Sequence, residues 1–117
     1  MVNYETQLNS IFTALSHPAR RAMLARLGQG EATVGELAQP LDISLPAVTK
    51  HLKVLERAKL ITRSKNAQWR PCRLEEAPLN AASGWIEEQR KVWESRLDRL
   101  DAYLHTLHPK TTKGEKP

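Results

Sequence analysis

The chain has 117 residues, one cysteine, 40% hydrophobic and 26% charged residues, and a net charge of +5. This length suits one domain, the composition excludes a disordered chain, and a lone cysteine excludes an internal disulfide and favours the reducing cytoplasm. No apolar run is long enough to cross a membrane and the N-terminus lacks a signal-peptide pattern, so we expect no membrane association.

The positive charge is concentrated in the middle of the chain. The segment 44–73 carries a net charge of +7, whereas the rest of the chain carries −2. A solvated helix face usually carries charges of both signs, so a segment of one sign favours a surface that binds phosphate groups. The sequence therefore predicts an anionic partner that contacts this segment.

Four helices are predicted in the first half of the chain. Apolar residues at helical spacing predict a helix from Tyr4 that ends just before Pro18, because a residue before proline avoids the helical region. Pro18 suits the first turn of a second helix, which ends at Gly28. A capping-box pattern opens the third helix, Thr33–Gln39, and a serine caps the fourth, Ser44–Ala58.

The second half of the chain predicts a β-hairpin and one long helix. Residues that favour strands predict two short strands at Leu60–Ser64 and Trp69–Leu74, and a proline makes the second an edge strand. A long helix starts at Pro78, with apolar residues about every 3.5 positions. We assign residues 1–108 to one domain and residues 109–117 to a polar, disordered tail.

These elements combine into a mainly α fold with a small β-hairpin, the winged helix-turn-helix. Thr33–Gln39 and Ser44–Ala58 form the helix-turn-helix, and the second of these helices fits the major groove of B-DNA. Its buried stripe is marked by Val48, Leu52 and Leu55. The opposite face carries Pro46, Thr49, Lys50, Lys53 and Arg57.

The place of each residue on this helix predicts its role. Thr49 and Lys50 lie early enough to reach bases, where Lys50 donates to guanine and Thr49 contacts thymine or adenine. Lys53 and Arg57 lie further along the helix and are expected to meet phosphate groups. His51 lies on the flank, where a base contact and packing against a neighbouring helix are both open.

The predicted hairpin forms a basic wing. Arg63, Lys65 and Arg70 surround its tip and are expected to contact the DNA backbone or the adjacent minor groove. The alternative is that these charges only keep an exposed sheet edge soluble. Trp69 is expected to be buried under the wing rather than to stack on a base.

Two segments resemble a known family: Leu15–Leu24 (LSHPARRAML) and Ser44–Ile61 (SLPAVTKHLKVLERAKLI). With the wing and the last helix included, most of the chain is similar to ArsR-type bacterial transcriptional regulators. The resemblance implies a homodimer that binds double-stranded DNA at an inverted-repeat operator and usually represses transcription. It also implies that the first and last helices form the dimer interface.

The residues expected at each surface follow from the helix faces and the resemblance together. The expected DNA-binding residues are Ser44, Leu45, Pro46, Thr49, Lys50, His51, Lys53, Arg57, Arg63, Lys65 and Arg70. The expected dimer interface consists of Leu8, Ile11, Phe12, Trp85, Ile86, Trp93, Leu97, Leu100 and Leu104.

Three positions depart from the family pattern. Leu45 stands where members often carry a polar residue, which favours contact with a thymine methyl group over a hydrogen bond. Lys59 stands where a glycine commonly follows the recognition helix, and a left-handed non-glycine residue costs about 1 kcal/mol. The metal-sensing members carry a Cys-x-Cys pair in the helix that corresponds to Thr33–Gln39, and this chain has none.

Metal and small-molecule sites are weakly indicated. His105 and His108 are three residues apart on the last helix, but no matching Asp-x-His precedes them, so we expect neither a metal nor a cofactor. Cys72 is expected to pack in a strand rather than to sense oxidants. The aromatic residues Trp85, Trp93 and Tyr103 line either a ligand pocket between subunits or, more commonly, an interface core, and the effector stays unknown.

Two other classes of function compete with DNA binding. In a protein-interaction module, the basic helix would dock an acidic partner, and Lys50→Glu would abolish that binding without changing DNA retention. An enzyme is not expected, because the sequence shows no Ser/His/Asp set, no paired carboxylates in a cleft and no glycine-rich phosphate loop. The sequence therefore predicts a sequence-specific regulator of transcription.

Overall fold

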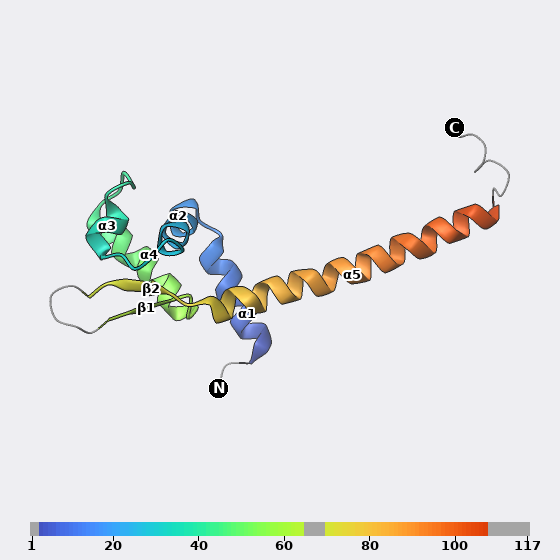
Figure 1. Ribbon diagram of the computed structural model, residues 1–117, viewed down its shortest axis with the longest axis horizontal. Helices are drawn as coiled ribbons and strands as arrows, with labels where there is room; N and C mark the ends of the chain where they lie inside the picture. The colour runs from blue at the N-terminus through green and yellow to red at the C-terminus, as the bar shows by residue number, and fades with distance from the viewer. Residues whose placement is uncertain (1–2, 65–69, 108–117) are drawn as a thin grey trace. The chain divides into compact units, whose positions relative to one another are not determined.

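A computed structural model describes residues 3–64 and 70–107, and the chain divides into two compact units, Met1–Ala82 and Ser83–Pro117. The elements in chain order are α1 (Tyr4–Leu15), α2 (Pro18–Leu27), α3 (Val34–Ala38), α4 (Leu45–Arg57), β1 (Ile61–Arg63), β2 (Cys72–Leu74) and α5 (Glu76–Leu107) (Figure 1). In the described ranges, no helix has the length and hydrophobicity that a membrane crossing requires.

The helices of the first unit begin where a side chain satisfies a free backbone N–H. Asn3 caps α1, and the Nδ1 atom of His17 accepts from the amide of Ala19 at the start of α2. At α3 the hydroxyl of Thr33 accepts from the amide of Glu36, whose carboxylate accepts from the amide of Thr33. This reciprocal capping box confirms the predicted start of α3, and the bond to the Thr33 amide lowers the pKa of Glu36.

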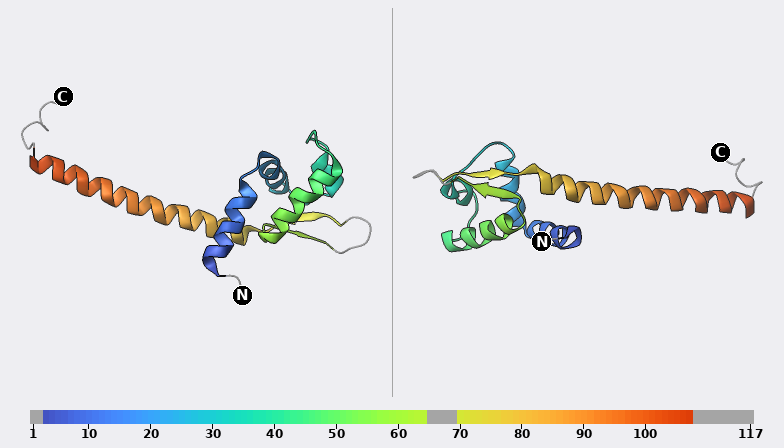
Figure 2. Two further views of the ribbon diagram at one scale, coloured as in Figure 1. Left: turned by 180° about the vertical axis from the view of Figure 1, so that it is seen from behind. Right: turned by 90° about the horizontal axis from the view of Figure 1, so that it is seen from below.

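The core of the first unit is built around α4. Its stripe Val48, Leu52 and Leu55 is fully buried, as predicted, and α4 packs against α1, α2, α3 and β1. Figure 1 shows α2 and α3 above the hairpin and α4 running from α3 across the strands, and the right-hand view in Figure 2 shows α4 beside the strands. The remaining members of this core are Ala14, Met23, Leu24, Leu27, Ala32, Leu37, Ala58, Leu60, Ile61 and Cys72.

The hairpin is present but its strands are shorter than predicted. β1 and β2 pair antiparallel, with Ile61 opposite Leu74 and Arg63 opposite Cys72. Pro71 lies outside β2 because it has no N–H to donate, although its carbonyl still accepts from the amide of Ser64 at 2.9 Å. The predicted tip, with Lys65 and Trp69, lies outside the described residues.

The end of α4 turns through the left-handed conformation that the sequence predicted. Lys59 has a φ of 64°. Its amide donates to the carbonyl of Glu56 at 2.9 Å, and the amide of Leu60 donates to the carbonyl of Leu55 at 3.0 Å. These two bonds form a Schellman motif, in which the buried side chains of Leu55 and Leu60 supply the usual apolar pair. α4 therefore ends sharply, and β1 begins two residues after Lys59.

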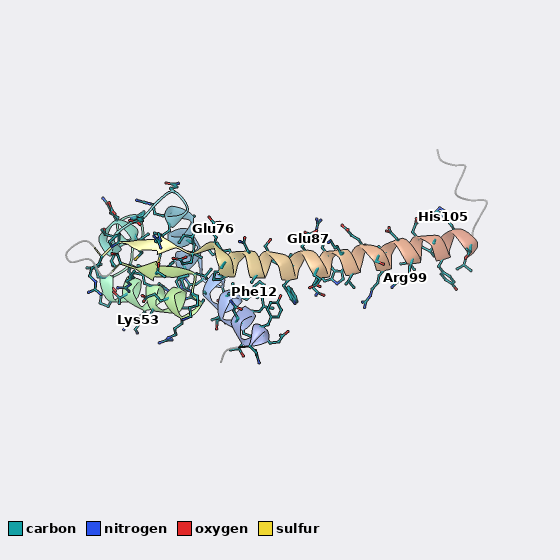
Figure 3. All side chains as sticks on the ribbon, turned by 60° about the horizontal axis from the view of Figure 1, so that its bottom comes forward. Phe12, Lys53, Glu76, Glu87, Arg99 and His105 are labelled. Carbon is teal, nitrogen blue, oxygen red and sulfur yellow. The ribbon has the colours of Figure 1, made fainter. Side chains whose placement is uncertain are left out.

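α5 begins two residues earlier than predicted. It starts at Glu76, which places Pro78 in the first turn, where the missing N–H is tolerated. From Ser83 onward its residues make up the second unit. Glu87, Arg99 and His105 lie along it in Figure 3, and Arg90 forms ion pairs with Glu87 at 3.4 Å and with a second glutamate one turn later.

Candidate nucleic-acid interface

The outer face of α4 carries most of the predicted DNA-binding residues. Ser44, Leu45, Pro46, Lys50, Lys53 and Arg57 are exposed, and Thr49 is half-buried. Ser44 also caps the helix, since its hydroxyl accepts from the amide of Ala47 at 3.3 Å. Figure 3 shows Lys53 on the outside of α4. One face of α4 is therefore fixed in the core while the other is free to meet a partner.

The cations on this face differ from those of the hairpin in their pairing. Within residues 3–64 and 70–107, no ion pair involves Lys50, Lys53 or Arg57. In contrast, the Nε atom of Arg63 lies 3.5 Å from a carboxylate oxygen of Glu56, and the Arg63 side chain is only 22% exposed. The charges on α4 are thus available to an anion, whereas Arg63 is largely buried beside Glu56, where its Nε atom forms no hydrogen bond to the described residues.

The wing is only partly within the described residues. Arg70 is exposed, with a φ of 40°, while Lys65 lies outside the described ranges. On β2, the guanidinium of Arg73 lies 3.6 Å from the carboxylate of Glu75. Contacts from the wing to DNA therefore stay predictions, and Arg70 is the candidate whose exposure fits them best.

His51 turns away from the outer face of α4. Its Nδ1 atom lies 3.0 Å from a guanidinium nitrogen of Arg20, and its ring centroid lies 4.3 Å from that of His17. Burial lowers the pKa of His51, and the charges of His17 and Arg20 lower it further. Of the two interpretations that the sequence left open, this geometry favours packing against a neighbouring helix.

Arg20 is the residue that the sequence did not single out. Its Nε atom donates to the carbonyl of Ala14 at 2.8 Å, and a terminal nitrogen donates to the carbonyl of Thr13 at 3.0 Å. These carbonyls belong to the last turn of α1, so Arg20 joins α1 and α2 to His51 of α4. In the sequence, Arg20 appears as a basic residue in the first turn of α2, a position where a charge is ordinarily exposed to solvent.

The expected dimer residues fall into two groups. Leu8 and Ile11 are buried within the protomer, at 4% and 0% exposure, so they leave little area for a second copy. Phe12 is 38% exposed. On α5, six expected interface residues are all exposed: Trp85, Ile86, Trp93, Leu97, Leu100 and Leu104. The apolar surface available to a partner thus lies mainly on α5.

The structure describes two of the three candidate metal and redox residues, His105 and Cys72. The Nδ1 atom of His105 contacts the carbonyl of Asp101 at 2.9 Å, and His108 lies outside the described residues. Among residues 3–64 and 70–107, no three His, Cys, Asp or Glu side chains are grouped to hold a metal ion. Cys72 is fully buried, and burial raises the pKa of its thiol, which opposes the thiolate that an oxidant sensor needs.

The tryptophans of α5 border an apolar hollow. Trp85, Ile86, Gln89, Arg90 and Trp93 line it, with a volume of about 230 Å³. A helix that packs against another commonly receives a side chain of its partner in such a gap.

Known proteins resemble this chain over most of its length. Residues 15–64 match a helix-turn-helix domain family. The transcriptional repressor SdpR of Bacillus subtilis is 32% identical over 68% of this chain and 88% of its own length. The crystal structure of an ArsR family transcriptional regulator superposes with a TM-score of 0.74 at 46% identity, covering 81% of this chain and 98% of that one.

A second solved structure extends the match. An ArsR-like transcriptional regulator from Rhodococcus is 29% identical, with a TM-score of 0.72 over 89% of this chain and 94% of its own. The capped helices α3 and α4 and the antiparallel hairpin form a winged helix-turn-helix, which is the fold that these matches indicate. The chain belongs to the ArsR family of winged helix-turn-helix transcriptional regulators.

Proposed function

We propose that the protein is a homodimeric transcriptional repressor that binds an inverted-repeat DNA operator through α4. The observation that carries this proposal is the division of α4 into two faces. The stripe with Leu52 is locked in the core, while Lys50, Lys53 and Arg57 are exposed and without ion pairs to other described residues. Among the described residues, a partner that neutralises these charges breaks no ion pair inside the protein.

The order of residues on α4 divides base reading from phosphate binding. Thr49 and Lys50 lie in the first half of the helix, where side chains of a recognition helix reach base edges in the major groove. Lys53 and Arg57 lie one and two turns further along, where they meet the phosphate backbone. The exposed methyl groups of Leu45 suit the C5-methyl group of thymine.

The second copy is proposed from the apolar seam on α5. Ile86, Trp93, Leu97, Leu100, Leu104 and Leu107 are exposed, and with Arg90 they alternate spacings of three and four residues. This spacing is the a/d pattern of a two-stranded coiled coil. A seam of this size is unusual on a solvent-facing helix, so we assign it to a second copy of the chain, which brings two recognition helices to one operator.

The proposal is tested by selecting duplexes from a random pool with the unmodified protein. The expected product is an inverted repeat whose half-sites are centred about 34 Å apart along the duplex, one helical turn. Binding to it is expected to weaken steeply with salt, because several phosphates are neutralised. Failure to enrich any duplex, or an enriched site without symmetry, would contradict the proposal.

Substitutions then separate the two roles. Lys50→Ala is expected to lower affinity for the selected duplex more than for random DNA, by about 1–3 kcal/mol of discrimination. Lys53→Ala is expected to lower both affinities alike and to reduce the salt slope by about one. Lys91→Ala, an exposed lysine on α5 outside the matched domain, is the control and should change neither. Equal effects of Lys50→Ala on both DNAs would show that Lys50 does not read bases.

A further inference from the structure

The cluster of Arg20, His17 and His51 is not used by the proposed DNA contacts, although it holds the recognition helix. The guanidinium of Arg20 binds the carbonyls of Thr13 and Ala14 at the end of α1 and the ring of His51 on α4. Both carbonyls lie at the end of α1, which carries the negative end of the helix dipole, and the carbonyl of Thr13 also accepts from the amide and the hydroxyl of Ser16. A single planar side chain therefore ties three helices together.

The bond to His51 requires a neutral imidazole. Arginine has donors and no acceptor, so the Nδ1 atom of His51 must be unprotonated to accept from Arg20. The Nδ1 atom of His17 likewise accepts from the amide of Ala19, at 3.0 Å. Protonation of His51 would remove the acceptor and place an imidazolium against Arg20 and 4.3 Å from the ring of His17.

We propose that Arg20 is a positioning residue for DNA binding, and that its bond to neutral His51 makes the orientation of the recognition helix sensitive to acid. His51 lies between Lys50 and Lys53, so a shift of α4 at this point moves both residues proposed to touch DNA. Because burial lowers the pKa of His51 from its ordinary value of 6.5, the loss is expected at a pH below that value. The inference rests on the proposed function, since its readout is operator binding.

The groups that face His51 come from one side of α4. Among the described residues, the charges that act on its pKa are those of His17, the cap of α2, and Arg20, within α2. α1 contributes the carbonyls of Thr13 and Ala14 through Arg20. No acidic side chain in the described ranges acts on His51, so nothing there compensates a second positive charge.

The sign of the pH effect separates this arrangement from a direct DNA contact. A histidine that touches phosphate binds DNA more tightly when it is protonated, because it gains a positive charge. A histidine that must stay neutral to hold the helix weakens binding when it is protonated. His51 lies on the flank of α4, beside the exposed Lys50 and Lys53. Because the two arrangements predict opposite changes in DNA affinity, one pH titration of binding distinguishes them.

The test measures affinity for the duplex selected at about pH 7.5, at constant salt, down to about pH 5. The unmodified protein is expected to lose about tenfold in affinity, the range of one hydrogen bond to a charged group. His51→Asn offers a non-titrating acceptor, so it should keep the affinity at the higher pH and lose the acid effect. His17→Asn keeps a good helix cap and should retain the acid effect.

Variants of two arginines provide a second test of the inference. Arg20→Ala is expected to bind about tenfold more weakly at the higher pH and to change little with acid. Arg21→Ala is the matched control, because Arg21 donates to the carbonyl of Leu15 at 2.7 Å and, within the part of the chain that the structure describes, forms no hydrogen bond to α4. A His51 ring titration followed by NMR shows whether the affinity and the proton change together.

The outcomes distinguish the two proposals. If no duplex is selected, the proposed function fails, and this inference fails with it. If a duplex is selected but binding strengthens or stays level in acid, only this inference is overturned. This inference alone is also overturned if His51→Asn loses DNA affinity in acid as the unmodified protein does. Should Arg20→Ala fail to fold, the two histidine variants still decide the matter.

Discussion

Lys59 offers a direct test of how α4 is terminated. Its φ of 64° places a side chain in the left-handed region, while its amide and that of Leu60 close the Schellman motif. Replacing Lys59 with glycine removes the Cβ atom and leaves both backbone bonds in place. The change therefore isolates the conformational cost of a side chain at this position.

The expected gain in stability is small but measurable. Relief of the left-handed conformation gives about 1–2 kcal/mol. Glycine has more conformational freedom in the unfolded chain, which lowers the free energy of unfolding by about 0.5–1 kcal/mol. Lys59→Gly should therefore raise the free energy of unfolding by up to about 1.5 kcal/mol, with a midpoint of about 0.75 kcal/mol, which shifts the melting temperature by a few degrees, at about 4–8 °C per kcal/mol for a domain of this size.

The assay is urea unfolding followed by circular dichroism, at one fixed protein concentration because self-association adds to stability. Lys59→Ala is the matched control, since it removes the same charge and keeps the Cβ atom. We expect the glycine variant to be the more stable of the two. If glycine and alanine give equal unfolding free energies, the argument from backbone strain at this position is refuted.

Two further predictions concern α5 and the thiol. Leu97→Asp, at an exposed seam position, should yield monomers in analytical ultracentrifugation without lowering helix content, and a dimer that persists would remove the seam from the interface. Cys72, fully buried with a raised thiol pKa, should react with a thiol reagent only as fast as the protein opens, so reaction at the rate of a free thiol would show that it is accessible.

The parts of the fold that the sequence predicted depend on local signals. Thr33 and Glu36 are three residues apart, and a capping box needs only that spacing and a free helix start. The buried stripe of α4 follows from apolar residues on one helical face, as Leu52 and Leu55 show. The left-handed Lys59 was also predictable, because the resemblance places a glycine there.

The parts that the sequence did not predict depend on residues far apart in the chain. Arg20 and His51 are 31 positions apart, and they meet only because α2 packs against α4. Arg63 was assigned to DNA by its charge and its place near the hairpin tip, and its pairing with Glu56 requires knowing that β1 returns beside α4. Leu8 shows the same limit, since an apolar face does not reveal whether its own chain or a partner covers it.

The three faces of α4 predict three separable kinds of defect. A change on the buried face, such as at Leu52, acts through the core and lowers the free energy of unfolding by about 2–5 kcal/mol. A change at Lys53 acts through charge, so it alters the salt dependence of DNA binding and leaves stability almost unchanged. A change at His51 acts through Arg20, so it alters the pH dependence. Because each face responds to a different variable, an effect on DNA binding is traced to its face by varying denaturant, salt and pH in turn.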